Sequence, residues 1–233
     1  MKRIVLIALT VVFGLNGFSQ TWDEIIKAVA SDRGAGDQFG FSVSISGDKA
    51  IMGAFLEQED ATGGNTLTAA GAAYIFELQS GEWTQTAKLV ASDRGEFDLF
   101  GKSVSISGDR VIIGATIEDE DAAGGNTLTS AGSAYIFELQ SGVWTETAKL
   151  VASDRTEQSL FGYRVDISGD KAIVSAYFEH DDILGLFVGS AYVFELESGV
   201  WNETAKLVPS DRAANDYFGY SVSISGERAI VGA

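Results

Sequence analysis

Polar and apolar residues alternate with a period of two through much of the chain, the pattern of β-strands that bury one face. Residues 103–107 read Ser-Val-Ser-Ile-Ser, and residues 110–115 follow as a more continuously apolar segment. Between them, Gly108 and Asp109 fit a two-residue hairpin turn with glycine first. The pattern predicts two antiparallel strands joined by a tight turn.

Two further strands are predicted after a long acidic loop at residues 116–131. Residues 133–139 are rich in aromatic and β-branched side chains, which favour strands. Residues 144–152 alternate again, after a Gln-Ser-Gly turn at 140–142. A unit of this kind contains four antiparallel strands.

The four-strand pattern recurs along the chain at spacings of about 61, 61 and 57 residues, a period typical of stacked or circular arrays. We predict an all-β fold, a β-propeller of four-stranded antiparallel blades. A β-solenoid and a row of small sandwiches are the alternatives. The units are marked by Trp22, Trp83, Trp144 and Trp201, and by Phe-Gly pairs that begin at Phe39, Phe100, Phe161 and Phe218.

These paired motifs resemble the FG-GAP repeat of the integrin α-subunit propeller. Phe100-Gly101 opens the first strand of a unit and Gly114-Ala115 closes the second, although the third unit has Ser175-Ala176 at the closing position. The Ser-Gly-Asp hairpins and the segment from Gly189 to Phe194 are most similar to secreted bacterial FG-GAP proteins. The resemblance covers residues 21–233 and implies a role in adhesion or recognition. The integrin calcium loop between strands one and two is not carried over, because a two-residue turn cannot supply six to eight oxygen ligands.

Counting strands predicts about three and a half blades. Residues 22–30 read as a fourth strand that completes another blade, and Gly232-Ala233 closes only the second strand of the fourth unit. Because closed rings usually have four to eight blades, we expect part of a seven-bladed ring. The alternative is closure by pairing with copies of the same chain, and either further blades or such copies are expected partners.

Residues 1–20 are predicted to be a signal peptide. Lys2 and Arg3 precede an apolar stretch from Ile4 to Leu15, and small residues follow it. The expected location is therefore secreted or cell-surface, with no membrane insertion once the signal is removed; an N-terminal membrane anchor is the alternative. The chain has no cysteine, which excludes lipid attachment through a cysteine and stabilisation by disulfides.

The formal net charge of −17 excludes one class of partner. Without a basic stripe, the chain has nothing to neutralise phosphates, so nucleic acid and anionic lipid are not expected partners.

The long acidic loops and the Ala-Ser-Asp-Arg connections should lie at the same end of the blades, opposite the short turns. That long-loop face is the candidate binding face, because ligand sites often sit on loops held by rigid strands. Weak calcium binding by the loops, helped by Asn65 or Asn126, is one interpretation. A solvated loop is the other, and it is favoured because no spacing matches a known calcium loop. The acids are Glu57, Glu59 and Asp60, then Glu118, Asp119, Glu120 and Asp121, then Glu179, Asp181 and Asp182.

Recurrence in every unit favours structural roles for the Asp-Arg pairs and the tryptophans. Each Asp-Arg is expected to be a charge-assisted pair or a backbone cap that ties one blade to the next, rather than a substrate-recognition pair. The tryptophans are expected to anchor the outer strand, with sugar stacking as the alternative. The Asp-Arg pairs are Asp32-Arg33, Asp93-Arg94, Asp154-Arg155 and Asp211-Arg212.

The third unit departs from the pattern with a shorter loop and an apolar run from Ile183 to Val188. This run is either an exposed interaction patch or a plug folded into the disc. His180 is the only histidine, too few for a zinc site, and no nucleophile signature accompanies it. We therefore name no catalytic, cofactor or metal residues and expect no cofactor.

Together these features predict an exported, non-enzymatic interaction or adhesion module that presents propeller loops to an extracellular protein or glycan ligand. The alternative is a carbohydrate-active or calcium-dependent enzyme or lectin built on a propeller. An enzyme of that kind would need a convergent pair of carboxylates, one with a raised pKa, which the repeated acids do not single out.

Overall fold

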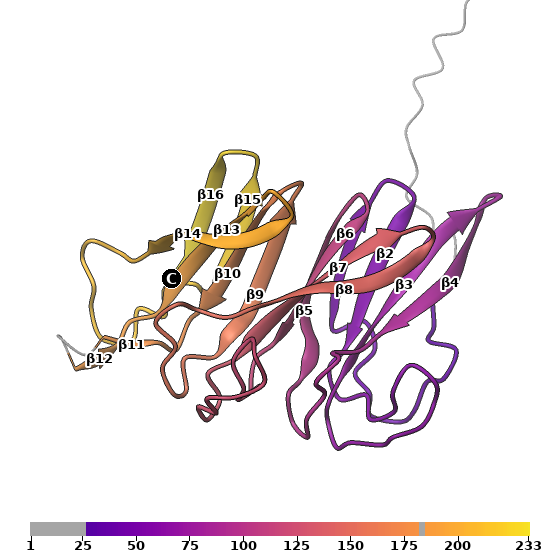
Figure 1. Cartoon of the computed structure of the whole chain (residues 1–233), viewed down its shortest axis with the longest axis horizontal. Coiled ribbons are helices and arrows are strands. Elements are labelled where there is room, and N and C mark those ends of the chain that lie inside the picture. Colours follow the sequence, from indigo (N-terminus) through magenta and orange to yellow (C-terminus); the bar gives the residue numbers. More distant parts are fainter. Residues whose placement is uncertain (1–26, 182–184) are drawn as a thin grey trace, which may run out of the picture.

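The computed structural model describes residues 27–181 and 185–233. Within these ranges the chain contains β-strands and no α-helix, so no described helix could cross a membrane. Three four-stranded antiparallel sheets and one two-stranded sheet stand side by side like blades, and a short hairpin, β11–β12, extends from the third (Figure 1). The predicted all-β propeller is confirmed as a partial β-propeller.

The strands follow one another as a meander within each blade. The first blade consists of β1 (Ser42–Ser46), β2 (Lys49–Ala54), β3 (Ala72–Gln79) and β4 (Glu82–Leu89). The second consists of β5 (Phe100–Ser107), β6 (Arg110–Ala115), β7 (Ser133–Gln140) and β8 (Val143–Leu150). The third consists of β9 (Phe161–Ser168), β10 (Lys171–Ala176), β13 (Ser190–Glu197) and β14 (Val200–Leu207), with β11 (His180–Asp181) and β12 (Leu186–Phe187) in its loop. The fourth sheet is β15 (Ser221–Ser225) with β16 (Arg228–Gly232).

Several boundaries differ from the prediction; the strand expected at 144–152, for example, is Val143–Leu150. β5 begins at Phe100 rather than Ser103, because Phe100 already pairs with Ala115 before a register shift at Gly101 and Lys102. Gly101 has a φ of +89°, and a side chain there would place its Cβ 2.3 Å from the carbonyl oxygen of Ala72 in the first blade. Only glycine fits this bulge. In the predicted outer strand at 22–30, residues 22–26 lie outside the described ranges and residues 27–30 form no strand.

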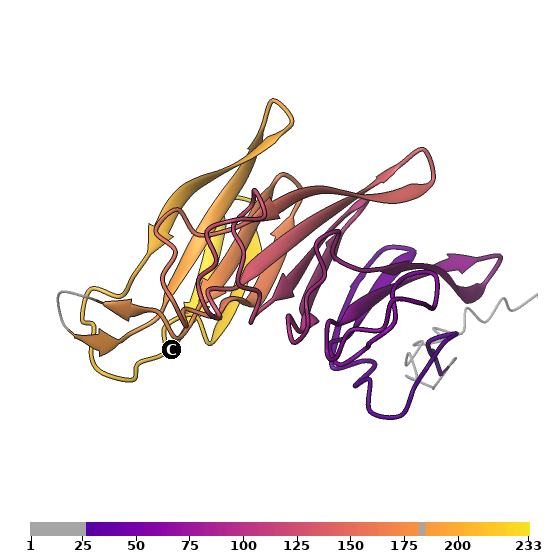
Figure 2. The same ribbon diagram turned by 60° about the horizontal axis from the view of Figure 1, so that its bottom comes forward.

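The core lies between blades, where adjacent sheets face each other (Figure 2). Ile51 and Ile75 of the first blade share one buried cluster with Val104 and Ile106 of the second. A corresponding cluster joins the second and third blades. Each central strand is covered on both faces, so its sequence is apolar with little alternation. This agrees with the continuously apolar pattern from which the second strand of the unit was predicted.

The Phe-Gly phenylalanines sit at the loop end of this core. Phe100 is fully buried, and its ring meets Tyr135 and Phe137 edge-on at centroid distances of 5.5 and 6.1 Å. Phe161 makes the same contacts with Tyr192 and Phe194. Edge-to-face geometry of this kind adds to the energy of burial, so the motif anchors each blade to its own third strand.

Serine hydroxyls link the innermost strands of neighbouring blades. Ser44 Oγ accepts a hydrogen bond from the Ile106 N–H at 3.2 Å, and Ser46 Oγ accepts one from Gly108 at 3.1 Å. Ser105 binds the Ile167 N–H in the same way at 3.3 Å. The Ser-Val-Ser-Ile-Ser alternation thus turns its apolar side toward the preceding blade and its hydroxyls toward the following one.

The two kinds of loop separate as predicted. The short turns lie at one end of the sheets, and the long loops and blade connections lie at the other (Figures 1 and 2). The Leu78 N–H near the end of β3 donates to the Asp48 carbonyl of the β1–β2 turn at 2.8 Å, which ties the two short-turn hairpins together. The long-loop face therefore rests on rigid strands.

Candidate ligand-binding face

Each long loop begins with a buried glutamate. Glu57, Glu118 and Glu179 are 3%, 2% and 5% exposed, although the acidic composition of the loops predicted solvated side chains. Burying a carboxylate is costly unless it is paired and hydrogen-bonded. Each of these glutamates therefore needs a partner from elsewhere in the blade.

The partner is the lysine near the end of the fourth strand. In the second blade, Lys149 Nζ lies 3.0 Å from Glu118 and 2.7 Å from Asp93, the aspartate of the Asp-Arg connection. The Tyr135 hydroxyl donates to Asp93 at 2.8 Å, and the Ser133 hydroxyl donates to Glu118. A buried network thus joins the loop, the connection and two strands.

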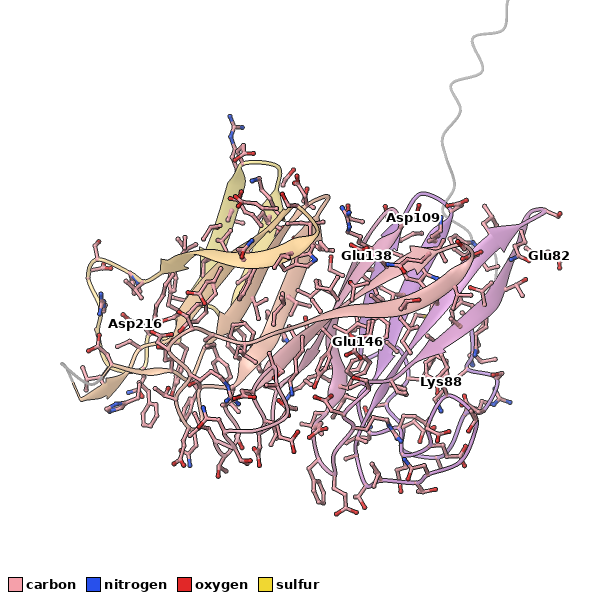
Figure 3. All side chains as sticks on the ribbon, viewed as in Figure 1. Glu82, Lys88, Asp109, Glu138, Glu146 and Asp216 are labelled. Atoms are coloured by element: carbon pink, nitrogen blue, oxygen red, sulfur yellow. The ribbon has the colours of Figure 1, made fainter. Side chains whose placement is uncertain are left out.

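The first and third blades repeat the network. Lys88 Nζ lies 2.6 Å from Asp32 and 3.4 Å from Glu57, and Figure 3 shows Lys88 near the loop end of β4, with Glu82 at the hairpin end. In the third blade, Lys206 pairs with Glu179 and lies 2.6 Å from Asp154.

Hydrogen bonds with partners favour the charged forms of Lys149 and Asp154 in these networks. Burial disfavours the charged form of Lys149, but hydrogen bonds with Asp93 and Glu118 outweigh it and raise the pKa of Lys149. Burial likewise opposes ionisation of Asp154, but hydrogen bonds from Lys206 and Tyr192 lower its pKa. The acids at the base of each loop are therefore committed to internal ion pairs.

The Asp-Arg connections tie blades together, but not as a direct pair. The aspartate binds the lysine and tyrosine of the following blade, as Asp93 does, while the arginine caps the loop of the preceding blade. Arg94 donates to the carbonyl oxygens of Gln58 and Asn65 at 2.8 and 3.1 Å. Arg155 donates to those of Asp119 and Asn126 at 2.7 and 3.0 Å. The structural interpretation is confirmed for these connections. The aspartate forms a charge-assisted pair with a lysine, and Arg94 and Arg155 form backbone caps, whereas Arg212 pairs with the Asp181 carboxylate.

The outer loop acids also bind their own loops. Asp60 Oδ1 accepts hydrogen bonds from the Thr62 hydroxyl at 2.7 Å and the Gly64 N–H at 3.1 Å, which lower the pKa of Asp60 to about 2. Asp121 caps Ala123 and Gly125 in the same way. These acids hold the turns of their loops.

One cluster of three carboxylates has oxygens within 4.8 Å of one another: Asp93, Glu118 and Glu120. Two of them already share the Lys149 ammonium. The lysine supplies the positive charge at this point, so the cluster is part of the blade network.

The tryptophans pack as the anchoring interpretation predicted. Trp144 and Trp201 are half-buried against the core clusters between blades, and Trp83 is half-buried against a cluster formed by the first blade and Ala30. Trp22 lies outside the described residues.

An aromatic cluster on the third blade distinguishes it from the others. The rings of Tyr163 and Tyr177 lie 3.9 Å apart between centroids, and Tyr220 of the fourth unit lies 5.7 Å from Tyr163. Phe178 stacks on Phe187 at 4.4 Å. These rings come from the start of β9, the loop after β10 and the Phe-Gly segment before β15. We call these five residues, together with Tyr217, which stacks on Phe178, the aromatic cluster.

The apolar run from Ile183 to Val188 contributes to this cluster. Phe187 is half-buried on Phe178, and Val188 is only 3% exposed, so these two residues fold against the blade. Ile183 and Leu184 lie outside the described residues, as does Asp182. The described part of the run therefore packs against its own blade instead of forming a fully exposed patch.

Two basic side chains lie against the Tyr163 ring. The Arg164 guanidinium carbon is 4.4 Å from the ring centroid, and Lys102 Nζ is 5.6 Å from it. Burial lowers the pKa of Lys102, and the nearby Arg164 charge lowers it further. Within residues 27–181 and 185–233, neither side chain forms an ion pair with a carboxylate. The other lysines of the blades, Lys49, Lys88, Lys149, Lys171 and Lys206, all do.

A cavity of about 450 Å³ opens on the same blade beside its network. Its lining includes Lys206, His180 and Arg212, and Arg212 pairs with Asp181. The His180 ring lies 5.2 Å from Phe187, so the single histidine belongs to the edge of the aromatic cluster.

Sequence reasoning did not single out this cluster or its two cations. The signal was present as an aromatic residue after three Phe-Gly pairs, at Phe41, Tyr163 and Tyr220, with Lys102 at the same position of the second unit. The sequence does not show that blade packing brings these positions together with Tyr177.

The FG-GAP repeat family matches four stretches of the chain, residues 22–76, 83–137, 144–194 and 201–233. These stretches cover most of the chain, and the last three begin in the outer strand of one blade, β4, β8 or β14, and end in the following sheet. The chain therefore belongs to the FG-GAP repeat family. No curated protein matches it.

Proposed function

We propose that the chain is an exported, non-enzymatic binding module whose long-loop face takes up an extracellular or cell-surface ligand at the third blade. The observation that carries this proposal is the aromatic cluster beside Lys102 and Arg164. Neither cation has an acidic partner among the described residues, and Lys102 is also partly desolvated, in a chain with a net charge of −17. Their unmet positive charge favours an anionic ligand.

The proposed ligand is an acidic glycan such as a uronic-acid polymer. Sugar rings stack their apolar faces on aromatic side chains, and the exposed ring of Tyr220 offers such a face. A uronate carboxylate would lie near Lys102 and Arg164 and form charge-assisted hydrogen bonds with them. The loops of the first two blades are poorer candidates, because they present acids, of which Glu57 and Glu118 are engaged in internal ion pairs and Asp60 and Asp121 in turn caps.

Calorimetric titration with polyuronate oligomers tests the proposal, with neutral glucan oligomers of equal length for comparison. We expect polyuronate binding, at least tenfold weaker in the double variant Lys102→Gln/Arg164→Gln and in Tyr220→Ala. Arg33→Gln is the matched control, since it removes one charge at an exposed site on the loop end of the first blade. Absence of polyuronate binding, or equal binding by the double variant, would contradict the proposal.

The alternative is an enzyme built on the same scaffold, and one residue favours it. Burial raises the pKa of Asp98 to about 6, and Asp98 lines a cavity of about 370 Å³ with Glu118 and Glu120. Glycoside hydrolysis needs an acid with a raised pKa close to a second carboxylate. Asp98 also accepts a hydrogen bond from the Gly95 N–H, and Asp216 makes the same cap to Ala213, which indicates a turn-forming role. Release of reducing ends from polyuronate, abolished by Asp98→Asn, would establish the enzyme instead.

A further inference from the structure

The buried network of the third blade is open to solvent because the loop that covers it is short. This loop runs from 177 to 189, against 116–132 in the second blade. The side chain of Lys206 is 30% exposed, whereas those of Lys88 and Lys149 are 6% and 7% exposed. No described sheet precedes the first blade, yet its lysine is buried, so the loop and the connection provide the cover. In the third blade, the cavity of about 450 Å³ reaches the network instead.

Arg212, which lines this cavity, has a different partner from the arginines at the same position of the other connections. Arg94 and Arg155 each cap two loop carbonyl oxygens, whereas Nη1 of Arg212 pairs with the Asp181 carboxylate. Nη2 of Arg212 donates no hydrogen bond to any residue that the structure describes. One guanidinium nitrogen is therefore available to a molecule in the cavity.

The cavity also offers donors and acceptors side by side. Lys206 donates to Asp154 and Glu179, which uses two of the three N–H groups of its ammonium. Asp154 accepts one hydrogen bond on each oxygen, from Lys206 and from the Tyr192 hydroxyl. Its side chain is half exposed and keeps further lone pairs for a ligand. A ligand group that both donates and accepts fits this arrangement best.

Hydroxyl groups meet this requirement. Each has one donor and two acceptor lone pairs, so neighbouring hydroxyls can accept from Lys206 or Arg212 and donate to Asp154. An anion is disfavoured, because the lining carries the carboxylates of Asp154, Glu179 and Asp181 against one lysine and one arginine. A ligand ammonium would compete with Lys206 for the same carboxylate. The charges of the lining therefore favour a neutral, hydroxyl-rich molecule.

The size and the apolar walls of the cavity fit a sugar ring. Val188 and Val208 form part of the lining, and the His180 ring stands beside them. The C–H groups of a pyranose pack on apolar and aromatic surfaces of this kind. The volume of about 450 Å³ falls within the roughly 300–1,000 Å³ of small-molecule sites.

The second blade does not offer the same chemistry. Its cavity of about 370 Å³ is lined by six acids and by no lysine, arginine or histidine. Lys149 stays covered there, and Arg155 is bound to the loop backbone. The combination of cations, carboxylates and apolar walls therefore distinguishes the third blade from the second and does not follow from the repeat.

We propose that the third-blade cavity is a subsite for a neutral sugar unit, a pyranose with neighbouring hydroxyls. The proposal deepens the proposed function and rests on it for the class of ligand. The cavity adjoins the aromatic cluster at His180, whose ring lies 5.2 Å from Phe187. The ligand is then a glycan that combines uronate units, held at the cluster, with a neutral unit held in the cavity.

NMR titration of the full chain tests this proposal, with the methyl glycosides of glucose, galactose and mannose as probes. At least one of them should shift the backbone amide signals of Asp154, Lys206 and Arg212. The matching uronoside, in which a carboxylate replaces the hydroxymethyl group, should bind at least tenfold more weakly. Val208→Phe fills the cavity without removing a charge and should weaken binding of the neutral glycoside at least tenfold.

Val90→Phe is the matched control, since Val90 follows β4 as Val208 follows β14. It should bind the neutral glycoside like the unmodified chain. Circular dichroism shows whether each variant is folded. A misfolded Val208→Phe is replaced by Asp181→Asn/Arg212→Gln, which removes an ion pair as a unit, leaves the net charge unchanged and should weaken binding to the same extent.

Three results would overturn the proposal: no amide shift with any of the three glycosides, unchanged binding by the folded cavity variant, or a uronoside that binds as tightly as the neutral sugar. Polyuronate binding and its loss in Lys102→Gln/Arg164→Gln are measured on other variants. The proposed function can therefore stand while the cavity subsite fails, and the cavity can bind a neutral sugar while polyuronate binding fails.

Discussion

At the scale of single residues, Asp98 shows how a turn cap can carry an electrostatic cost. Its carboxylate accepts the Gly95 N–H, yet it is only 7% exposed and lies near Glu118 and Asp93. Burial, followed by the charges of these two acids, raises the pKa of Asp98 from 3.8 to about 6. The third blade makes a related turn with Ser159, an uncharged residue.

We predict that Asp98→Asn stabilises the chain at pH 7 by on the order of 2 kcal/mol, and that this gain disappears toward pH 4. Because the folded pKa of about 6 exceeds the unfolded value of 3.8, the ionised carboxylate lowers stability above pH 6. Protonation removes that cost as the pH falls between these values. Urea unfolding at pH 7.5 and pH 4.5 measures the difference between variant and parent. Asp98→Ser should behave alike, and a pH-independent difference would refute the prediction.

At the scale of strands and loops, the closeness of neighbouring blades is set by glycine. A Cβ on Gly114 of β6 would lie 2.0 Å from the Gly162 carbonyl oxygen of the third blade. This neighbour is backbone, so the blades themselves would have to separate. Ser175 occupies the same position in the third blade, where its Oγ accepts the Arg164 N–H at 3.0 Å and the fourth sheet packs differently.

We predict that Gly114→Ser lowers the free energy of unfolding by about 2 kcal/mol or more. The added side chain would push the second and third blades apart and weaken their shared core. Gly125→Ser provides the control, because a Cβ on Gly125 meets nothing within 4 Å. Thermal unfolding of the two variants compares the same chemical change at a blade interface and in a loop. Equal stability of the two would show that the blades can separate without cost.

The strands could be predicted from local patterns, whereas the site could not. Alternation defined β1 and its repeats, because each hydroxyl and each apolar side chain has its own neighbouring blade. The bulge at Gly101 was missed because its cause, the Ala72 carbonyl, lies in another blade. Glu118 was read as solvated because its partner Lys149 comes 31 residues later. The repeat places such partners at fixed offsets, but only the packed blades show that they meet.

At the scale of the whole molecule, stability should vary along the row of blades. Each blade contacts its sequence neighbours, so central sheets have two covered faces and the end sheets one. The fully buried isoleucines Ile112 and Ile136 lie in the second blade, while Ile230 of the fourth sheet is mostly exposed. Local opening should follow this gradient.

We predict that backbone amides of β6 and β7 exchange with deuterium at least tenfold more slowly than those of β15 and β16. Mass spectrometry of peptic fragments measures the rates at low protein concentration. Uniform protection across all blades at low concentration would contradict the gradient.

In an Asp-Arg connection the two residues bind different blades, and this arrangement affects how the gene can change by duplication. Asp93 binds forward to the second blade, and Arg94 binds back to the loop of the first. A DNA segment copied from one tryptophan codon to the next would therefore encode a unit that already carries its contacts to both neighbours. Tandem duplication or loss of whole units would leave every remaining junction intact. Blade number could then vary between lineages faster than blade sequence.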